Sequence, residues 1–305
     1  MKLSTATGGQ PLDPHAEKAN YMRIREAGFR YVNYDFPNYS LNAPEGMDYM
    51  GDEWKQVAAG HLELMKSSGL TPVMAHGPYC YPMPTEARTS FTAACIRTIE
   101  CCGEMGIPHI VMHPDARQGM SYDEFLTENR EYFRSLIPAA EKTGVTVLIE
   151  NIGQFCDPHY VHDGAELKRM IEAVEHPLFA ACWDTGHANH IMDDQTESLR
   201  TLGPLLKGLH VNDNLGDLQP KRKHYMIDMH TLPLFGTADY DGVIRTLKEI
   251  GYTGYFNFET AMPRSHPFKE GDRLAEIMPE LKKHTMKLLY ETGRLMLTAY
   301  DCYEE

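Results

Sequence analysis

The feature that most constrains this chain is a regular alternation of short apolar segments with amphipathic segments along its whole length. The apolar segments are rich in β-branched and aromatic residues, as strands are. The segments between them carry apolar residues at helical spacing, and several stop at a glycine. Strands are predicted at 3–7, 29–36, 70–75, 107–112, 145–149, 178–183, 207–209 and 255–258. Helices are predicted at 14–27, 52–68, 85–105, 121–142, 165–174, 196–202, 239–250 and 273–297.

Eight units in which a strand precedes a helix favour a parallel sheet with helical crossovers. In a chain of 305 residues, that number favours closure into a (β/α)8 TIM barrel over an open doubly wound sheet. No Gly-x-Gly-x-x-Gly follows the first strand, which argues against a dinucleotide-binding fold. We therefore predict a single α/β domain over residues 1–305, with long loops at 37–51 and 214–238 that shape a pocket.

The charge of the chain limits its partners. With 29 Lys and Arg against 43 Asp and Glu, the net charge is −14, which disfavours a nucleic-acid partner because phosphate backbones demand a basic surface. No run of about 18 apolar residues indicates a membrane span, and the first residues lack the apolar core of a signal peptide. The seven cysteines form no Cys-x-x-Cys pair, and the adjacent Cys101 and Cys102 are interpreted as buried thiols, so we expect a reducing, cytoplasmic location.

Four potential metal ligands stand at the ends of consecutive predicted strands: Glu150, Asp184, His210 and Glu259. A single acid after a strand is usually a helix cap or a solvated loop residue. Four in succession are much harder to attribute to chance, because the carboxyl ends of barrel strands meet on one face. Three carboxylates and one imidazole suit a divalent ion such as Mn, Co, Fe, Zn or Mg. Without a cation, the carboxylates would repel one another.

Five further polar residues are candidates for the same pocket. Singly, each has a plain structural explanation: the histidines as pocket walls or packing residues, and the Asp-x-His pair as surface residues of a loop. Together we interpret them as substrate-binding residues. They are His76, His113, His187, Asp228 and His230.

An ordered set of motifs resembles a known family. The motifs are Ile149-Glu150-Asn151, Cys182-Trp183-Asp184-Thr185-Gly186-His187, Leu209-His210-Val211-Asn212-Asp213, Asp228-x-His230 with Gly236, and Phe258-Glu259-Thr260. In this order they are similar to the sugar-phosphate isomerase/epimerase family with the xylose isomerase-like TIM barrel. That superfamily also includes ketose 3-epimerases, hydroxypyruvate isomerases, inosose dehydratases, endonuclease IV and the metal-bearing subunit of C-glycoside deglycosidases.

The resemblance implies a divalent-metal-dependent isomerase or epimerase acting on a small carbohydrate, that is, a sugar, keto-sugar or polyol. One ion held by Glu150, Asp184, His210 and Glu259 would bind a carbonyl and its neighbouring hydroxyl and stabilise an enediolate. Glu150 and Glu259 would be the catalytic residues, one taking the proton and the other returning it. His187 would orient a substrate hydroxyl or lie in the second shell of the metal.

Other functions remain open from the sequence. The same metal and base would serve a lyase acting on a 3-keto sugar, either a dehydratase or a deglycosidase-like subunit. Endonuclease IV resembles this chain in the histidines and the Asp-x-His pair, which would there bind three zinc ions; the charge of −14 argues against a DNA substrate. Ketose 3-epimerases carry an arginine where this chain has Gly216, which argues against a simple free ketose. A barrel without catalysis is a further alternative, and a homo-oligomer is compatible with all of these.

Overall fold

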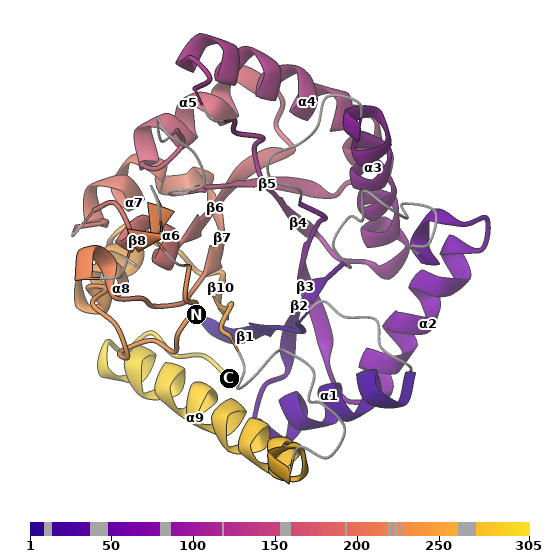
Figure 1. The fold of residues 1–305 in the computed structure, drawn as a ribbon, viewed down its shortest axis with the longest axis vertical. Coiled ribbons are helices and arrows are strands. Elements are labelled where there is room, and N and C mark those ends of the chain that lie inside the picture. Colours follow the sequence, from indigo (N-terminus) through magenta and orange to yellow (C-terminus); the bar gives the residue numbers. More distant parts are fainter. Residues whose placement is uncertain are drawn as a thin grey trace.

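The computed structural model describes residues 1–8, 14–36, 48–79, 87–117, 119–152, 160–192, 194–218, 221–222, 225–226, 228–261 and 273–305. Eight parallel strands form a nearly closed ring with helices packed around the outside (Figure 1). This is the predicted (β/α)8 barrel. The strands are β1 Lys2–Ala6, β2 Tyr31–Asp35, β3 Thr71–His76, β4 His109–Met112, β5 Thr146–Glu150, β6 Phe179–Asp184, β7 Leu206–His210 and β10 Tyr255–Phe258.

The sheet runs in the order β10-β1-β2-β3-β4-β5-β6-β7. Its two edge strands, β7 and β10, meet through an isolated bridge between Val211 and Phe258. Val211 N–H donates to Asn257 O at 2.8 Å, and Glu259 N–H donates to Val211 O at 3.2 Å. The ring therefore closes just beyond the end of β7, beside the position where candidate ligands stand.

The helices follow the strands in the order that the sequence predicts. They are α1 Pro14–Ala27, α2 Trp54–Ser67, α3 Arg88–Met105, α4 Tyr122–Thr143, α5 Gly164–Val174, α6 Thr185–Asn189, α7 Thr196–Leu202, α8 Tyr240–Glu249 and α9 Met278–Ala299. Short 3₁₀ turns are η2 Asp48–Met50, η4 Gly203–Leu205, η5 Gly216–Leu218 and η6 Arg273–Ile277. None of the helices within the described ranges is long and apolar enough to cross a membrane.

Local chemistry accounts for several helix ends. Ser121 accepts a hydrogen bond from Glu124 N–H while the Glu124 carboxylate accepts from Ser121 N–H, which is the predicted capping box of α4. Gly144 ends the same helix at a φ of 73°, a left-handed conformation that costs glycine little. Gly106 ends α3 at a φ of 70° in the same way.

The core has two layers. The larger layer lies between the strands and the surrounding helices, and the smaller one fills the inside of the barrel with Met74, Val111, Leu148, Ala180 and Cys182. A Cβ at Gly208 would lie 2.7 Å from Leu148 Cδ1, so this inner layer requires a glycine on β7. The filled interior leaves the carboxyl ends of the strands as the surface on which a site can form.

Two segments differ from the prediction. Thr185–Asn189 forms the short helix α6 directly after β6, because Asp184 accepts a hydrogen bond from His187 N–H and caps it. The predicted loop 214–238 was wrong in part, since it contains η5 and an antiparallel pair of two-residue strands, β8 Lys221–Arg222 and β9 Tyr225–Met226. Most of the predicted loop 37–51 lies outside the described residues, as do residues 85–86 of the third predicted helix.

Candidate metal centre

The four predicted ligands come together at the carboxyl face of the barrel. Glu150, Asp184 and His210 are the last residues of β5, β6 and β7, and Glu259 directly follows β10. One ligand atom from each lies within 4.8 Å of the others. Glu150, Asp184 and His210 are completely buried. Strands far apart in sequence therefore deliver four ligand atoms to a space that a single ion can fill.

His210 lies between the two glutamates. Its Nδ1 atom is 3.0 Å from Glu150 Oε1 and 3.0 Å from Glu259 Oε2. Asp184 is held by neutral donors instead: Asn212 Nδ2 donates to Oδ2 at 2.7 Å, and His187 N–H donates to Oδ1 at 2.6 Å. These contacts fix the orientation of each ligand without using up its remaining lone pairs.

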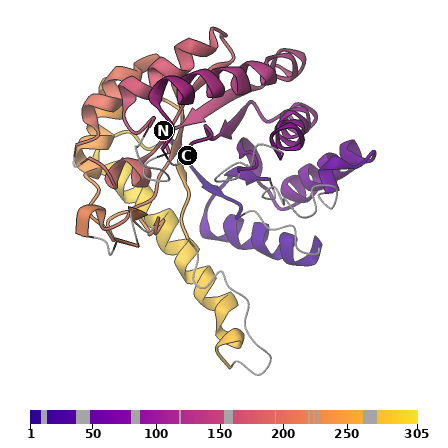
Figure 2. The same cartoon turned by 45° about the horizontal axis from the view of Figure 1, so that its top comes forward.

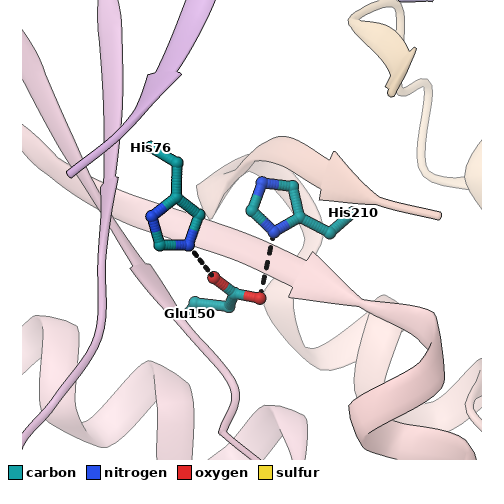
Figure 3. A group of neighbouring side chains, drawn as sticks. All are labelled: His76, Glu150 and His210. Carbon is teal, nitrogen blue, oxygen red and sulfur yellow. Dashed lines mark hydrogen bonds and ion pairs between the residues drawn. The ribbon is translucent and has the colours of Figure 1, made fainter. Parts of the chain in front are cut away.

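His76 and His113 approach the other oxygen of Glu150. His113 Nε2 is 2.8 Å from Glu150 Oε2, and His76 Nε2 is 3.6 Å from the same atom. Figure 3 shows Glu150 between His76 and His210, with one carboxylate oxygen directed to each ring. His76, Glu150 and His210 form a second group with metal-ligand spacing. Glu150 is thus shared between two potential ion positions.

A third group with this spacing consists of His187, Asp228 and His230. Asp228 Oδ2 is 2.6 Å from His230 Nε2 and 3.3 Å from His187 Nε2. The other nitrogen of each ring is held by a backbone carbonyl: His187 Nδ1 by Asn151 O at 2.7 Å and His230 Nδ1 by Glu259 O at 2.8 Å. All nine predicted site residues therefore lie in one connected cluster of polar side chains.

The electrostatics of the first group favour ionised glutamates. Burial raises the pKa of Glu150, but His210 and His113 outweigh burial and hold that pKa well below its usual value. At Glu259 burial is likewise outweighed, by His210, and the pKa falls to about 2. Burial, opposed by His187, raises the pKa of Asp184 to about 6. The histidines therefore favour the ionised form of both glutamates. At Asp184, the attraction of His187 does not offset the effect of burial, and the equilibrium shifts towards the neutral form instead.

In the third group, Asp228 and the two histidines each stabilise the charged form of the other. Burial opposes ionisation of Asp228, but His230 and His187 lower its pKa far below the usual value. In the opposite sense, Asp228 outweighs burial and raises the pKa of His230 to about 10. A buried carboxylate between two imidazoles is stable as an ion pair, and also as a set of metal ligands once the imidazoles lose their protons.

The residues present fit a divalent ion on chemical grounds. The set of Glu150, Asp184, His210 and Glu259 offers three carboxylates and one imidazole nitrogen in a buried space, which suits Mn, Co, Fe, Zn or Mg. Asp228 Oδ1 is buried and has no hydrogen-bond partner among the described residues. A buried carboxylate oxygen without a donor is expensive, and a cation would satisfy it.

The sequence assigned no role to several residues that shape this pocket. Asn151 and Asn212 orient Asp184; each stands within a quoted motif, but a neutral amide gives no signal of metal binding on its own. Asp35 ends β2 and accepts hydrogen bonds from Gly8 N–H and from Asn33 Nδ2, each at 2.6 Å. Burial raises its pKa to about 6. In the sequence, the feature that could have marked Asp35 as a site residue was its position as an acid at the end of a predicted strand.

Gly216 cannot be replaced by the arginine of ketose 3-epimerases without rearrangement. It lies in η5 with a φ of 52°, and a Cβ there would approach Thr237 Oγ1 to 2.9 Å and Asn189 O to 3.1 Å. The backbone that follows β7 is therefore built for glycine.

A (β/α)8 barrel with candidate carboxylate and imidazole ligands at neighbouring strand ends is the class that the fold and the site define, and the comparison with known families agrees with the barrel. The chain belongs to the xylose isomerase-like TIM barrel family, whose model matches residues 22–284.

Two curated proteins and one solved structure are similar to this chain. The uncharacterized protein y4fM of Sinorhizobium fredii is 26% identical over 271 residues, covering 79% of this chain and 80% of the relative. A probable endonuclease 4 of Geobacter sulfurreducens is 35% identical over 135 residues, covering 43% of this chain and 45% of the relative. Among solved structures, D-psicose 3-epimerase in the presence of D-fructose superimposes with a TM-score of 0.70 at 17% identity, covering 97% of this chain and 99% of that one.

Proposed function

We propose that this protein is a divalent-metal-dependent isomerase or epimerase acting on a small carbohydrate. The observation that carries the proposal is the placement of two glutamates, the buried Glu150 and the partly exposed Glu259, on either side of His210 Nδ1, each 3.0 Å away. Both are ionised and both stand at strand ends next to Asp184. The likeness of the fold to D-psicose 3-epimerase supports this choice of substrate class.

Glu150, Asp184, His210 and Glu259 would hold the ion. When bound, a divalent ion supplies Lewis-acid stabilisation of the negative charge that develops when a proton leaves a carbon beside a carbonyl. The residues of the chain supply the rest. The carboxylate of Glu150 takes the proton at one face of the substrate, and that of Glu259 returns it at the other. Return to the same carbon on the opposite face epimerises it, and return to the adjacent carbon isomerises the sugar.

The surrounding polar residues would orient the substrate. His76 and His113 stand on one side of Glu150, whereas His187, Asp228 and His230 stand near Asp184 and Glu259. With one ion in the first group, these five side chains would not be ion ligands, and a substrate hydroxyl would replace one of their present contacts, such as that between Asp228 and His230. Exact orientation of a flexible polyhydroxy chain requires several such contacts at once.

The test is proton exchange. In deuterated water with manganese and a panel of keto-sugars, the wild type should incorporate deuterium at a carbon-bound position, and Glu150→Gln should lose at least about a hundredfold of that rate. Analysis of the product then separates isomer or epimer from the dehydrated or aglycone-free product of a lyase. Bound metal with no exchange for any sugar would refute the proposal.

A second candidate is a multi-zinc phosphodiesterase. It is favoured by the His187, Asp228 and His230 group and by Glu150 shared between two groups, which together offer ligands for more than one ion. The match to a probable endonuclease 4 points the same way. The net charge of −14 argues against a duplex substrate. Metal analysis decides: several zinc ions per chain and cleavage of DNA with an abasic site would favour this candidate over the sugar enzyme.

A further inference from the structure

The outer face of the C-terminal helix is unusually apolar. Eleven large hydrophobic side chains are exposed among the described residues, and five of them lie along η6 and α9. Their exposed fractions range from 41% to 60%. We call this set the leucine ridge; it consists of Leu274, Ile277, Leu281, Leu288 and Leu295. Contiguous exposed apolar residues of this kind mark interaction surfaces, whereas single ones do not.

The spacing places the leucine ridge on one face. Leu281, Leu288 and Leu295 follow one another at intervals of seven residues, which is close to two helical turns. The face that packs on the barrel is a different one, formed by Met286, Leu289, Gly293, Met296 and Leu297. Helix α9 therefore has two apolar faces, and the core accounts for only one of them.

The first half of α9 makes little contact with the barrel. No residue between 273 and 285 is buried, and the buried residues of α9 begin at Met286. Figure 2 shows this part of the helix projecting beyond the body of the molecule. This half of the helix gains little stability from its own barrel, so covering its apolar ridge with a partner would add to its stability.

We propose that the leucine ridge pairs with the leucine ridge of a second copy of this chain, with the two α9 helices antiparallel. Four of the five ridge positions, all except Ile277, are symmetric about a point between His284 and Thr285. A two-fold axis there sets Leu281 against the second copy's Leu288, and Leu274 against the second copy's Leu295. The projecting half of each helix then covers the exposed outer face of the other's anchored half, which is the self-complementary arrangement of a two-fold dimer.

The charged residues beside the leucine ridge also favour antiparallel pairing of the two α9 helices. On one flank, Glu276 and Glu280 precede the axis, and Lys287 and Arg294 follow it. Antiparallel pairing brings Glu280 of one copy near Lys287 of the other, and Glu276 near Arg294. Parallel pairing would instead set this charged flank against the uncharged flank of the second copy, so the opposite charges would not meet.

The remaining contacts are compatible with this arrangement. Glu291 pairs with Lys287 at 3.1 Å and with Arg294 at 2.8 Å in the same copy, so one acid is shared by two cations and positive charge is left over. The other flank of the ridge is uncharged: Met278, Thr285 and Thr292. In the antiparallel pair, this uncharged flank meets the same flank of the second copy, so no charges repel each other there. Together these features select a second copy over an unrelated partner.

Sedimentation tests the proposal. The wild type should be a dimer at micromolar concentrations, and the double variant Leu281→Asp/Leu288→Asp should be a monomer with an unchanged circular dichroism spectrum. The matched control is Leu218→Asp, which replaces a side chain with 76% exposure in η5 and should leave the dimer intact. A monomeric wild type overturns the proposal. That result would also be expected if residues 262–272 of the same chain covered the leucine ridge.

Charge reversal tests the direction. Glu280→Lys should weaken the dimer by about tenfold, and adding Lys287→Glu to it should restore the wild-type dissociation constant. In Thr285→Cys the two new thiols should lie near the two-fold axis, so oxidation should give a covalent dimer that the wild type does not form. A dimer that survives Leu281→Asp/Leu288→Asp, or a double reversal that weakens the dimer further, contradicts the antiparallel pairing.

Discussion

Asp213 is the residue that holds the loop behind the metal centre. Its Oδ1 accepts hydrogen bonds from Asn214 N–H at 2.9 Å and Ala238 N–H at 3.1 Å. Its Oδ2 accepts from Leu234 N–H and Gly236 N–H, each at 3.0 Å. One carboxylate thus satisfies the backbone donor of the next residue and three backbone donors of the segment that follows His230.

We expect Asp213→Ala to lower the free energy of unfolding by about 3 kcal/mol or more, because hydrogen bonds to a charged group each contribute about 1.5–3 kcal/mol and the donors are left without a partner. Asp213→Asn should cost less, since its amide oxygen can still accept. Urea unfolding measures both. A loss below about 1 kcal/mol for Asp213→Ala would show that water replaces the carboxylate.

His190 makes the folded state sensitive to acid. It is 4% exposed, and burial lowers its pKa to about 4. The unfolded chain, with a pKa near 6.5, binds a proton first as pH falls, so stability decreases between about pH 6.5 and pH 4 and is fully present above that window. This one group contributes about 3 kcal/mol to the decrease.

We therefore expect His190→Gln to flatten the dependence of unfolding free energy on pH across that window, while leaving the slope above pH 7 unchanged. Urea unfolding at a series of pH values measures this. If the free energy of unfolding depends on pH in the same way in both proteins, protonation of His190 does not destabilise the folded state.

At the scale of elements, α6 links the backbone to the metal centre. Asp184 is both the last residue of β6 and the N-cap of α6, and Asn212 donates to its second oxygen. A Cβ at Gly186 would overlap Asn212 Oδ1. The close approach of α6 to the end of β7 thus depends on a glycine.

Gly186→Ala should displace Asn212 and weaken metal binding by about tenfold or more, since partners that orient a ligand contribute 10–100-fold to affinity. Calorimetric titration with manganese measures the effect. Gly60→Ala is the matched control, because it lies in α2 with no atom within 4 Å of the new Cβ. Equal affinity in both variants would show that Asn212 does not position Asp184.

Helices and strands that carry a clear local sequence pattern could be predicted from the sequence. Short elements that carry no such pattern could not. The Ser121 capping box and the glycines after α3 and α4 fix helix ends by local chemistry. Helix α6 has five residues, too few for a periodic pattern, and β8 and β9 have two residues each. Such short elements form because tertiary contacts hold them, and a single sequence does not show those contacts.

At the scale of the whole molecule, the parallel barrel made the convergence of the four candidate ligands predictable. Once eight strands alternate with helices, every strand ends at the same face, and polar residues at those ends must meet. What the sequence could not show was the sharing of Glu150 between groups of ligands, which depends on distances of a few ångströms. The neutral contacts of Asn151 and Asn212 were hidden for the same reason.

Metal binding should stabilise the whole barrel. The site gathers buried carboxylates whose repulsion a cation removes, and an ion that binds only the folded state stabilises it by about 2.7 kcal/mol at a hundredfold excess over its Kd. Manganese should therefore raise the Tm of the wild type by several degrees, and a chelator should reverse the rise. Asp184→Asn should respond much less. Equal shifts in both proteins would locate the binding outside this centre.

The pairing of β10 with β1 gives the metal centre a further property. Lys2 lies opposite Tyr255, so the last strand to be synthesised must return to the first, and this is the most distant strand contact along the chain. Glu259 arrives only with that strand, on the far side of the bridge between Val211 and Phe258. A chain that has assembled seven strands thus holds three ligands, and the fourth appears when the ring shuts. On the proposed function, affinity for a divalent ion would therefore measure how completely the barrel has closed.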